Sequence, residues 1–254
     1  MNGASLTNNL QPNRPRERSW FYSIIGVVAL FAVCVGFGRT YVAPMVQGTF
    51  SGPLILHIHG AFALAWVLLF FTQPLLIRWR ALPAHRSLGY MGLPLALGVA
   101  GTMIPAGLFA TVRDVHAGLG SVAVSSLLGV VTSAVLFIVL VAAGITARRN
   151  REAHPRWMLL ATLLVIWPAW FRFRHWFPQV PRPELWFGVV LPMAWVVVAI
   201  VRDRVVRGAV HPVLLFAGTA LILEQAFELI SFDTPWWRAA AGAIFAWLGP
   251  SGSL

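Results

Sequence analysis

Four histidines recur along the chain at similar intervals. His59, His85, His116 and His154 are separated by 26, 31 and 38 residues. Each interval is close to one membrane crossing plus a short loop, so successive histidines are expected at opposite faces of a bilayer. Two neutral imidazoles on facing helices can ligate a b-type haem from both sides. The spacing therefore predicts up to two haems, one held by His59 and His116 and one by His85 and His154.

A fifth histidine, His57, lies two positions before His59 in the segment LHIHG. On a helix the two side chains project nearly opposite one another, so only one can face the core of a bundle. Gly60 would let a planar group or a second helix approach the backbone closely, which favours His59 as the haem ligand. An extended backbone would instead allow the His57 and His59 pair to bind copper or zinc.

Metal ligation competes with a simpler interpretation of these histidines. Side chains at helix ends often cap the helix or reach the lipid headgroups. His85 and His154 both stand close to an expected helix end, at HRSLGYMG and HPRWM. The full set of candidate metal ligands is His57, His59, His85, His116 and His154.

A second group of polar residues lies in apolar surroundings. Glu224 and Glu228 occur in LILEQAFELI, four residues apart and so on one helix face. Charged groups inside a membrane are costly and usually pair with one another or mark a functional site. Arg172 is expected at a similar depth, where it would either form a buried ion pair with the carboxylates or help to bind a substrate. In the second case the carboxylates would accept protons released by a quinol or another small electron donor.

The composition identifies the elements that must position these residues. Hydrophobic residues make up 58% of the 254 positions and charged residues 11%, whereas soluble domains carry roughly a quarter charged residues. The net charge is +11, and all 19 basic residues are arginines. Because they collect in short gaps between apolar segments, they indicate membrane topology and contact with a lipid bilayer, not nucleic-acid binding. Cys34 is the single cysteine, so a thiolate cage is excluded.

The apolar segments predict an all-α, polytopic transmembrane helix bundle with about seven helices. Each segment is near the ~20 residues that span a hydrocarbon core. The expected spans are 20–38, 53–77, 86–110, 117–146, 157–173, 185–201 and 211–231, and the second to fifth form a four-helix core. Residues 1–19 are expected to be a disordered cytoplasmic tail and 20–231 the transmembrane domain. Residues 232–254 are expected to lie at the membrane interface.

The arginines also predict the orientation of the chain. Alternate gaps are rich in arginine, beginning with Arg14, Arg16 and Arg18 before the first span. Positive charge is retained on the cytoplasmic side of membranes. The N-terminus is therefore expected in the cytoplasm and the C-terminus outside, in a bacterial inner membrane.

Two resemblances bear on function. The segments 56–76, HRSLGYMG (85–92) and 154–173 resemble an uncharacterised family of bacterial polytopic membrane proteins, a domain of unknown function. The pattern of one histidine per helix resembles the two-haem transmembrane b-type cytochromes. That second resemblance implies His59, His85, His116 and His154 as haem ligands, with Arg86 and Arg156 neutralising haem propionates or contacting lipid phosphate.

Three functions follow as hypotheses from these patterns. The first is a b-type cytochrome that transfers electrons across the membrane, and so an oxidoreductase. The second is a haem-free transporter or metal-binding membrane protein. Its outer site would be built from His57, His59, Glu224, Glu228 and Arg172. The third is a scaffold or accessory subunit that binds other membrane proteins, or further copies of itself, through small-residue faces such as Gly98/Gly101 and Gly118/Gly120.

Overall fold

A computed structural model describes residues 20–249 and shows the expected all-α helix bundle. Five stretches of the described chain are long and apolar enough to cross a membrane: Phe21–Val46, Leu54–Arg78, Leu82–Arg149, Pro183–Arg207 and Val213–Ser231. The third stretch contains two long helices. A further helical run between residues 153 and 171 brings the total to the seven expected helices. The tail predicted at residues 1–19 lies outside the described residues.

The first half of the bundle is built from α1 (Phe21–Phe37), α3 (Leu54–Arg78), α5 (Gly92–Asp114) and α6 (Gly120–Thr146). Short elements join them, namely η1 (Gly38–Val42), α2 (Ala43–Val46), α4 (Leu82–Gly89) and η2 (Val115–Leu119). The chain reverses between α5 and α6 at Gly118 and Gly120, whose φ angles are 88° and 54°. These angles lie in the left-handed region that glycine adopts most readily.

The second half begins after the single turn η3 (Ala147–Arg149). It contains α7 (Ala153–Val165), α8 (Trp167–Phe171), η4 (Arg172–His175), α9 (Pro183–Leu185), η5 (Trp186–Val190), α10 (Leu191–Arg207), η6 (Val213–Gly218), α11 (Thr219–Ser231) and α12 (Pro235–Leu248). The run from α7 to η4 is interrupted near Ile166, just before Pro168. Proline cannot donate the backbone hydrogen bond that would continue the helix.

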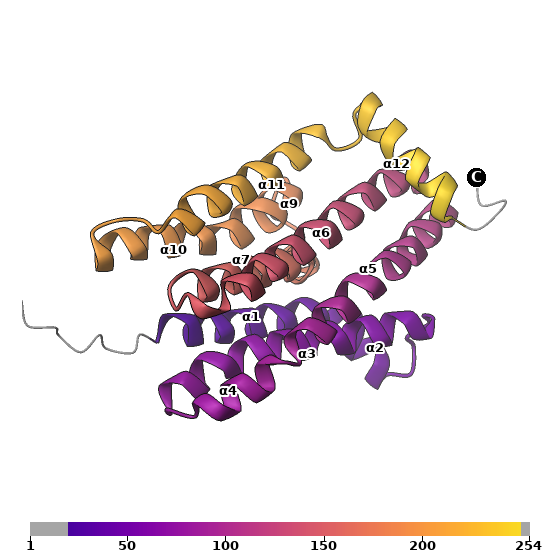
Figure 1. Cartoon of the computed structure of the whole chain (residues 1–254). Coiled ribbons are helices and arrows are strands. Elements are labelled where there is room, and N and C mark those ends of the chain that lie inside the picture. The colour runs from indigo at the N-terminus through magenta and orange to yellow at the C-terminus, as the bar shows by residue number, and fades with distance from the viewer. Residues whose placement is uncertain (1–19, 250–254) are drawn as a thin grey trace, which may run out of the picture.

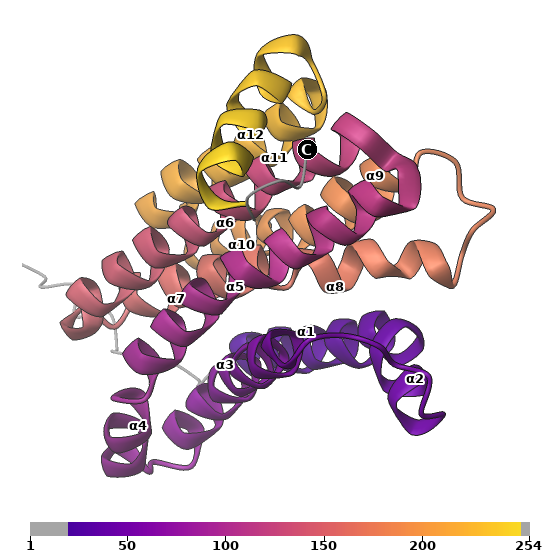
Figure 2. The same cartoon turned by 90° about the vertical axis from the view of Figure 1, so that its right-hand side faces the viewer.

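The helices form a layered bundle. In Figures 1 and 2, α1 and α3 lie on one side, α10 and α11 on the other, and α6 and α7 between them. Successive contacts of α3 with α5, α5 with α6, and α6 with α7 are completed by contact of α3 with α7. This ring is the predicted four-helix core.

Side chains fill the middle of this four-helix core. The ring of Trp66 on α3 packs edge-on against Phe137 on α6, with the ring centroids 5.0 Å apart. The indole nitrogen of Trp66 donates a hydrogen bond of 3.2 Å to Thr162 Oγ1 on α7. All three residues are buried. The core is therefore packed by an aromatic pair and a hydrogen bond at this level.

The prediction was wrong about where the third crossing begins. It placed the span at 86–110 with His85 at its start, whereas His85 lies in the separate helix α4 and the long helix α5 spans Gly92–Asp114. Pro83 stands in the first turn of α4, a position that proline favours because its missing N–H would have no partner there. His85 is thus carried by a short helix of its own.

The last helix, α12, packs against α6. Val124 and Leu127 of α6 form a small buried cluster with Ala241 and Phe245 of α12. The indole of Trp237 donates to the backbone oxygen of Ser125 at 2.9 Å. α12 is therefore tied to the bundle by packing and hydrogen bonds, while its placement at a membrane interface stays a prediction.

Candidate functional site

Polar residues gather at both ends of the bundle. Following the predicted orientation, we call the end that carries η3 and the last turn of α10 the inner end, and the end that carries η2 and η4 the outer end. The candidate histidines divide between these ends, with His57, His59 and His116 toward the outer end and His85 and His154 toward the inner end.

His57 and His59 bind different neighbours. The segment is helical, so the extended H-x-H chelate for copper or zinc is not formed. Nδ1 of His57 is 2.6 Å from the hydroxyl of Tyr41 in η1, and its ring packs on Phe50. Nδ1 of His59 is 3.0 Å from Thr102 Oγ1 on α5. Each imidazole therefore links α3 to a different part of the outer end.

His116, the expected partner of His59, is exposed in η2. Among the described residues, no hydrogen bond or electrostatic interaction joins His116 to His59. The structure therefore does not bring the outer pair together.

The two inner histidines, His85 on α4 and His154 on α7, interact with one another electrostatically. Nδ1 of His154 donates to the backbone oxygen of Gly144 on α6 at 2.8 Å. The side-chain amide of Gln73 on α3 directs its nitrogen to the His85 backbone oxygen (3.2 Å) and ring Nδ1, and its oxygen to the Gly89 N–H (3.2 Å). Both inner imidazoles are therefore held through Nδ1.

The described residues contain no group of three or more His, Cys, Asp or Glu side chains arranged to hold a metal ion. A site made of protein ligands alone would need such a group for zinc. Axial ligation of haem needs only two ligands.

Arg172 in η4 does not form the expected ion pair with Glu224 or Glu228. Its guanidinium donates to the backbone oxygen of Pro168 at 2.9 Å and lies 4.2 Å from the ring centroid of Phe37. The charged groups within electrostatic range of Arg172 include two other arginines, Arg174 and Arg113. Arg172 comes after the break between α7 and α8 near Ile166, so its position does not follow from the helical spacing of α7.

The two glutamates have other neighbours, and Glu228 faces α6. Glu224 accepts a hydrogen bond of 2.9 Å from the side chain of its neighbour Gln225. A Cβ atom added at Gly129 of α6 would overlap Oε1 of Glu228, so the missing side chain of Gly129 makes room for this carboxyl group. Ser133, one turn further along α6, has a buried hydroxyl without a hydrogen-bond partner.

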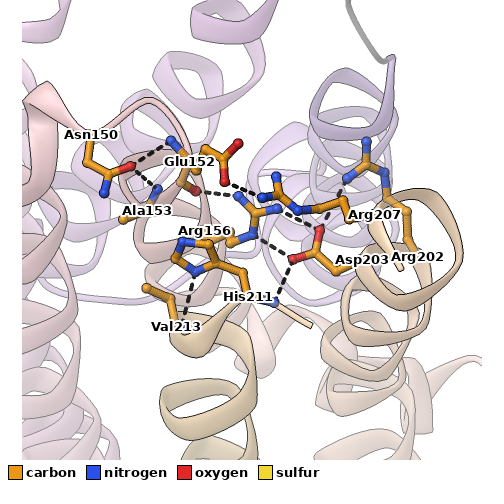
Figure 3. Close-up of polar contacts among 9 residues, drawn as sticks. All are labelled: Asn150, Glu152, Ala153, Arg156, Arg202, Asp203, Arg207, His211 and Val213. Carbon is orange, nitrogen blue, oxygen red and sulfur yellow. Dashed lines mark hydrogen bonds and ion pairs between the residues drawn. The ribbon is translucent and has the colours of Figure 1, made fainter. Parts of the chain in front are cut away.

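A dense ion-pair network occupies the inner end (Figure 3). Arg156 on α7 and Asp203 on α10 are only 3% and 1% exposed. The guanidinium donates two hydrogen bonds to the carboxylate, from Nε to Oδ2 at 2.8 Å and from Nη2 to Oδ1 at 2.6 Å. Arg202 also lies 3.5 Å from Asp203. Bidentate pairs of this kind fix both distance and orientation.

The same network reaches the neighbouring turns. Arg156 donates to the backbone oxygen of Glu152, whose carboxylate pairs with Arg207. Asp203 Oδ2 accepts from the His211 N–H at 3.3 Å, and His211 Nδ1 accepts from the Val213 N–H at 3.1 Å. Burial, assisted by Arg156 and Arg207, lowers the pKa of the His211 imidazole. These ion pairs and hydrogen bonds connect the inner ends of α7, α10 and η6.

This network changes the role expected for Arg156. Both its Nε and Nη2 are committed to Asp203, so Arg156 has a structural partner in place of a haem propionate or lipid phosphate. Arg86 remains exposed beside His85. Asp203 is not among the predicted site residues, although VRDR places a carboxylate between two arginines at the end of an apolar span.

Comparison with known proteins adds no family assignment. No family model matches the chain, and neither the curated proteins nor the solved structures give a match. The site must therefore be interpreted from its own residues.

Proposed function

We propose that this protein is a membrane electron-transfer protein that holds a b-type haem between His85 and His154. The observation that carries the proposal is the position of these two imidazoles. They come from different helices, α4 and α7, and lie within electrostatic range of one another. Five apolar stretches of membrane-spanning length support a lipid environment for the bundle that carries them.

The hydrogen bond of the His154 ring supports this choice. Histidines that ligate metals usually engage the other ring nitrogen with a protein group, which fixes the tautomer and orientation. Nδ1 of His154 donates to Gly144, which leaves Nε2 as the atom with a lone pair. Nδ1 of His85 meets the Gln73 amide. Haem binding would require this amide to turn, so that its oxygen accepts a hydrogen bond from Nδ1–H.

Bound haem would supply a one-electron redox centre. The residues of the chain would hold it, with His85 and His154 as the candidate iron ligands and the exposed Arg86 available to a propionate. A quinol or another small electron donor is the proposed partner. We restrict the proposal to one haem because nothing in the described chain links His116 to His59.

An optical spectrum tests this proposal directly. Protein purified after expression with ample haem supply should show reducible Soret and α-bands. His85→Ala and His154→Ala should each remove the low-spin spectrum, whereas the matched control His116→Ala should retain it. Colourless wild-type protein, or loss of the spectrum in all three variants alike, would overturn the assignment.

Glu228 favours a second candidate function, proton-coupled transport. Its carboxyl group lies against Gly129 without a described hydrogen bond, and the Ser133 hydroxyl one turn away is buried and unpartnered. An ionisable group inside a membrane is commonly part of a proton or ion pathway.

Dicyclohexylcarbodiimide, which modifies protonated carboxyl groups in apolar surroundings, is the appropriate probe for Glu228. Labelling of the wild type should be lost in Glu228→Gln and retained in the control Glu184→Gln. Equal labelling of both variants would count against Glu228 as the reactive carboxyl group.

A further inference from the structure

Arg172 is a half-buried guanidinium in cationic surroundings. Its protein partners are the Pro168 backbone oxygen, at 2.9 Å, and the face of the Phe37 ring. The charged groups that act on Arg172 most strongly are the guanidinium groups of Arg174 and Arg113. Removing a charge from water is costly unless an opposite charge compensates it. The described protein supplies Arg172 with no carboxylate partner.

Arg174, two residues later, has the same deficiency. Its Nη1 atom is buried and has no hydrogen-bond partner. The guanidinium lies 3.8 Å from the ring centroid of Phe171. Donor groups on arginine that are buried and unsatisfied cost free energy comparable to a lost charged hydrogen bond. An acceptor from outside the chain would remove that cost.

Asp114, a carboxylate that acts electrostatically on Arg174, already has a partner. Asp114 lies within electrostatic range of Arg174, but it accepts a hydrogen bond of 2.8 Å from Arg113 and is paired with that residue. Arg113 and Arg174 therefore share one carboxylate, and Arg172 has none among the described residues. Arg39 adds to the positive potential, because it acts together with Arg172 and Arg174 on the neighbouring His175.

We propose that Arg172 and Arg174, with Arg113 at the rim, form a site for a phosphate group at the outer end of the bundle. Guanidinium groups present planar forks of donors that match the oxygens of phosphate. Phosphate offers more acceptor oxygens and more negative charge than a carboxylate, which suits two under-coordinated arginines. Arg172 follows the end of a crossing, which is the depth of lipid headgroups.

The phosphate can come from two sources, an anionic phospholipid or a soluble phosphate compound. Both share the chemistry that the arginines recognise, and experiment separates them. The full-length protein is purified in a neutral detergent, and its melting temperature is measured alone, with phosphatidylglycerol, and with inorganic phosphate at matched ionic strength. Binding at about 100-fold above Kd should raise Tm by about 5–10 °C for a chain of this size.

The variants Arg172→Gln and Arg174→Gln should lose this rise in Tm. The exposed Arg182 on the same side provides the matched control, and Arg182→Gln should keep it. If Arg172→Gln does not fold, Arg172→Lys keeps the charge but loses the planar fork, and should show a reduced rise.

A rise with phosphatidylglycerol alone identifies a lipid headgroup as the ligand, and a rise with both probes identifies a site open to soluble phosphate. Either result supports the proposal when both glutamine variants abolish it. No rise with either probe, or the same rise in wild type and both glutamine variants, overturns it. The readout does not depend on haem, so it stands apart from the proposed electron transfer.

Discussion

Arg156 and Arg172 lie at opposite ends of the same helical run and have opposite surroundings. Arg156 is buried against Asp203 with two hydrogen bonds, and a third goes to the backbone of Glu152. Arg172 has a backbone oxygen, an aromatic face and other arginines as neighbours. A charge whose partners are all within the chain fixes the positions of helices. A charge without such a partner indicates a ligand from outside.

The largest expected effect is the loss of Arg156. Arg156→Gln leaves the Asp203 carboxylate buried without its main partner, and removing one member of a buried pair costs about 3–5 kcal/mol. The free energy of unfolding in mixed micelles measures this loss. The double variant Arg156→Leu with Asp203→Leu removes both charges and should recover most of the stability. Equal destabilisation in the double variant would show that packing, not charge, dominates at this position.

A smaller effect is expected at Gly129, beside Glu228. Gly129→Ala introduces a Cβ atom into the space of the Glu228 carboxyl group. The atom displaced is the end of a flexible side chain, so we expect a loss of about 1 kcal/mol, at the low end for overpacking. Unfolding in micelles again provides the measurement. Gly242→Ala on α12 is the control, because no atom lies within 4 Å of an added Cβ there. Equal losses in the two variants would contradict close packing of Glu228 on α6.

At the outer end, Arg172→Gln should change the free energy of unfolding less than Arg156→Gln does at the inner end. Arg172→Gln removes a charge that lacks a carboxylate partner, so the lost hydrogen bond to Pro168 is offset by the relief of burial and like-charge repulsion. In detergent without phosphate we expect a change of less than about 1 kcal/mol. A loss as large as that of Arg156→Gln would show that Arg172 has an equally strong internal partner, and would erase the contrast between the two ends.

The smallest effect concerns pH and His211. The folded protein lowers the pKa of this imidazole below its ordinary value of 6.5, first through burial and then through Arg156 and Arg207. Folding therefore favours the neutral ring. Its contribution to the free energy of unfolding is fully present above pH 6.5 and is lost as the pH falls through the pKa of the folded state. His211→Asn keeps an acceptor for the Val213 N–H but cannot titrate. Unfolding measured above and below pH 6.5 should show a shallower pH dependence in this variant. An unchanged dependence would assign the effect to other groups.

Hydropathy determined much of the fold. The seven apolar runs of the sequence correspond to the helices of the bundle, and α3, α5, α6 and α7 form the expected core. These features follow from composition over about 20 residues, because a segment that is apolar throughout must satisfy its backbone hydrogen bonds within a helix. The sequence also located His57, His59, His154 and the two glutamates along those helices.

Tertiary structure alone decided which of these residues meet. Arg156 and Asp203 are 47 residues apart, and His85 belongs to the separate helix α4. Glu228 faces Gly129, while Arg172 turns to Pro168 and Phe37. The direction of a side chain depends on the rotation and breaks of its helix and on every neighbour packed around it. Hydropathy reports how deep a residue lies in the membrane, but the partner of a charge is set by the packing of the whole bundle.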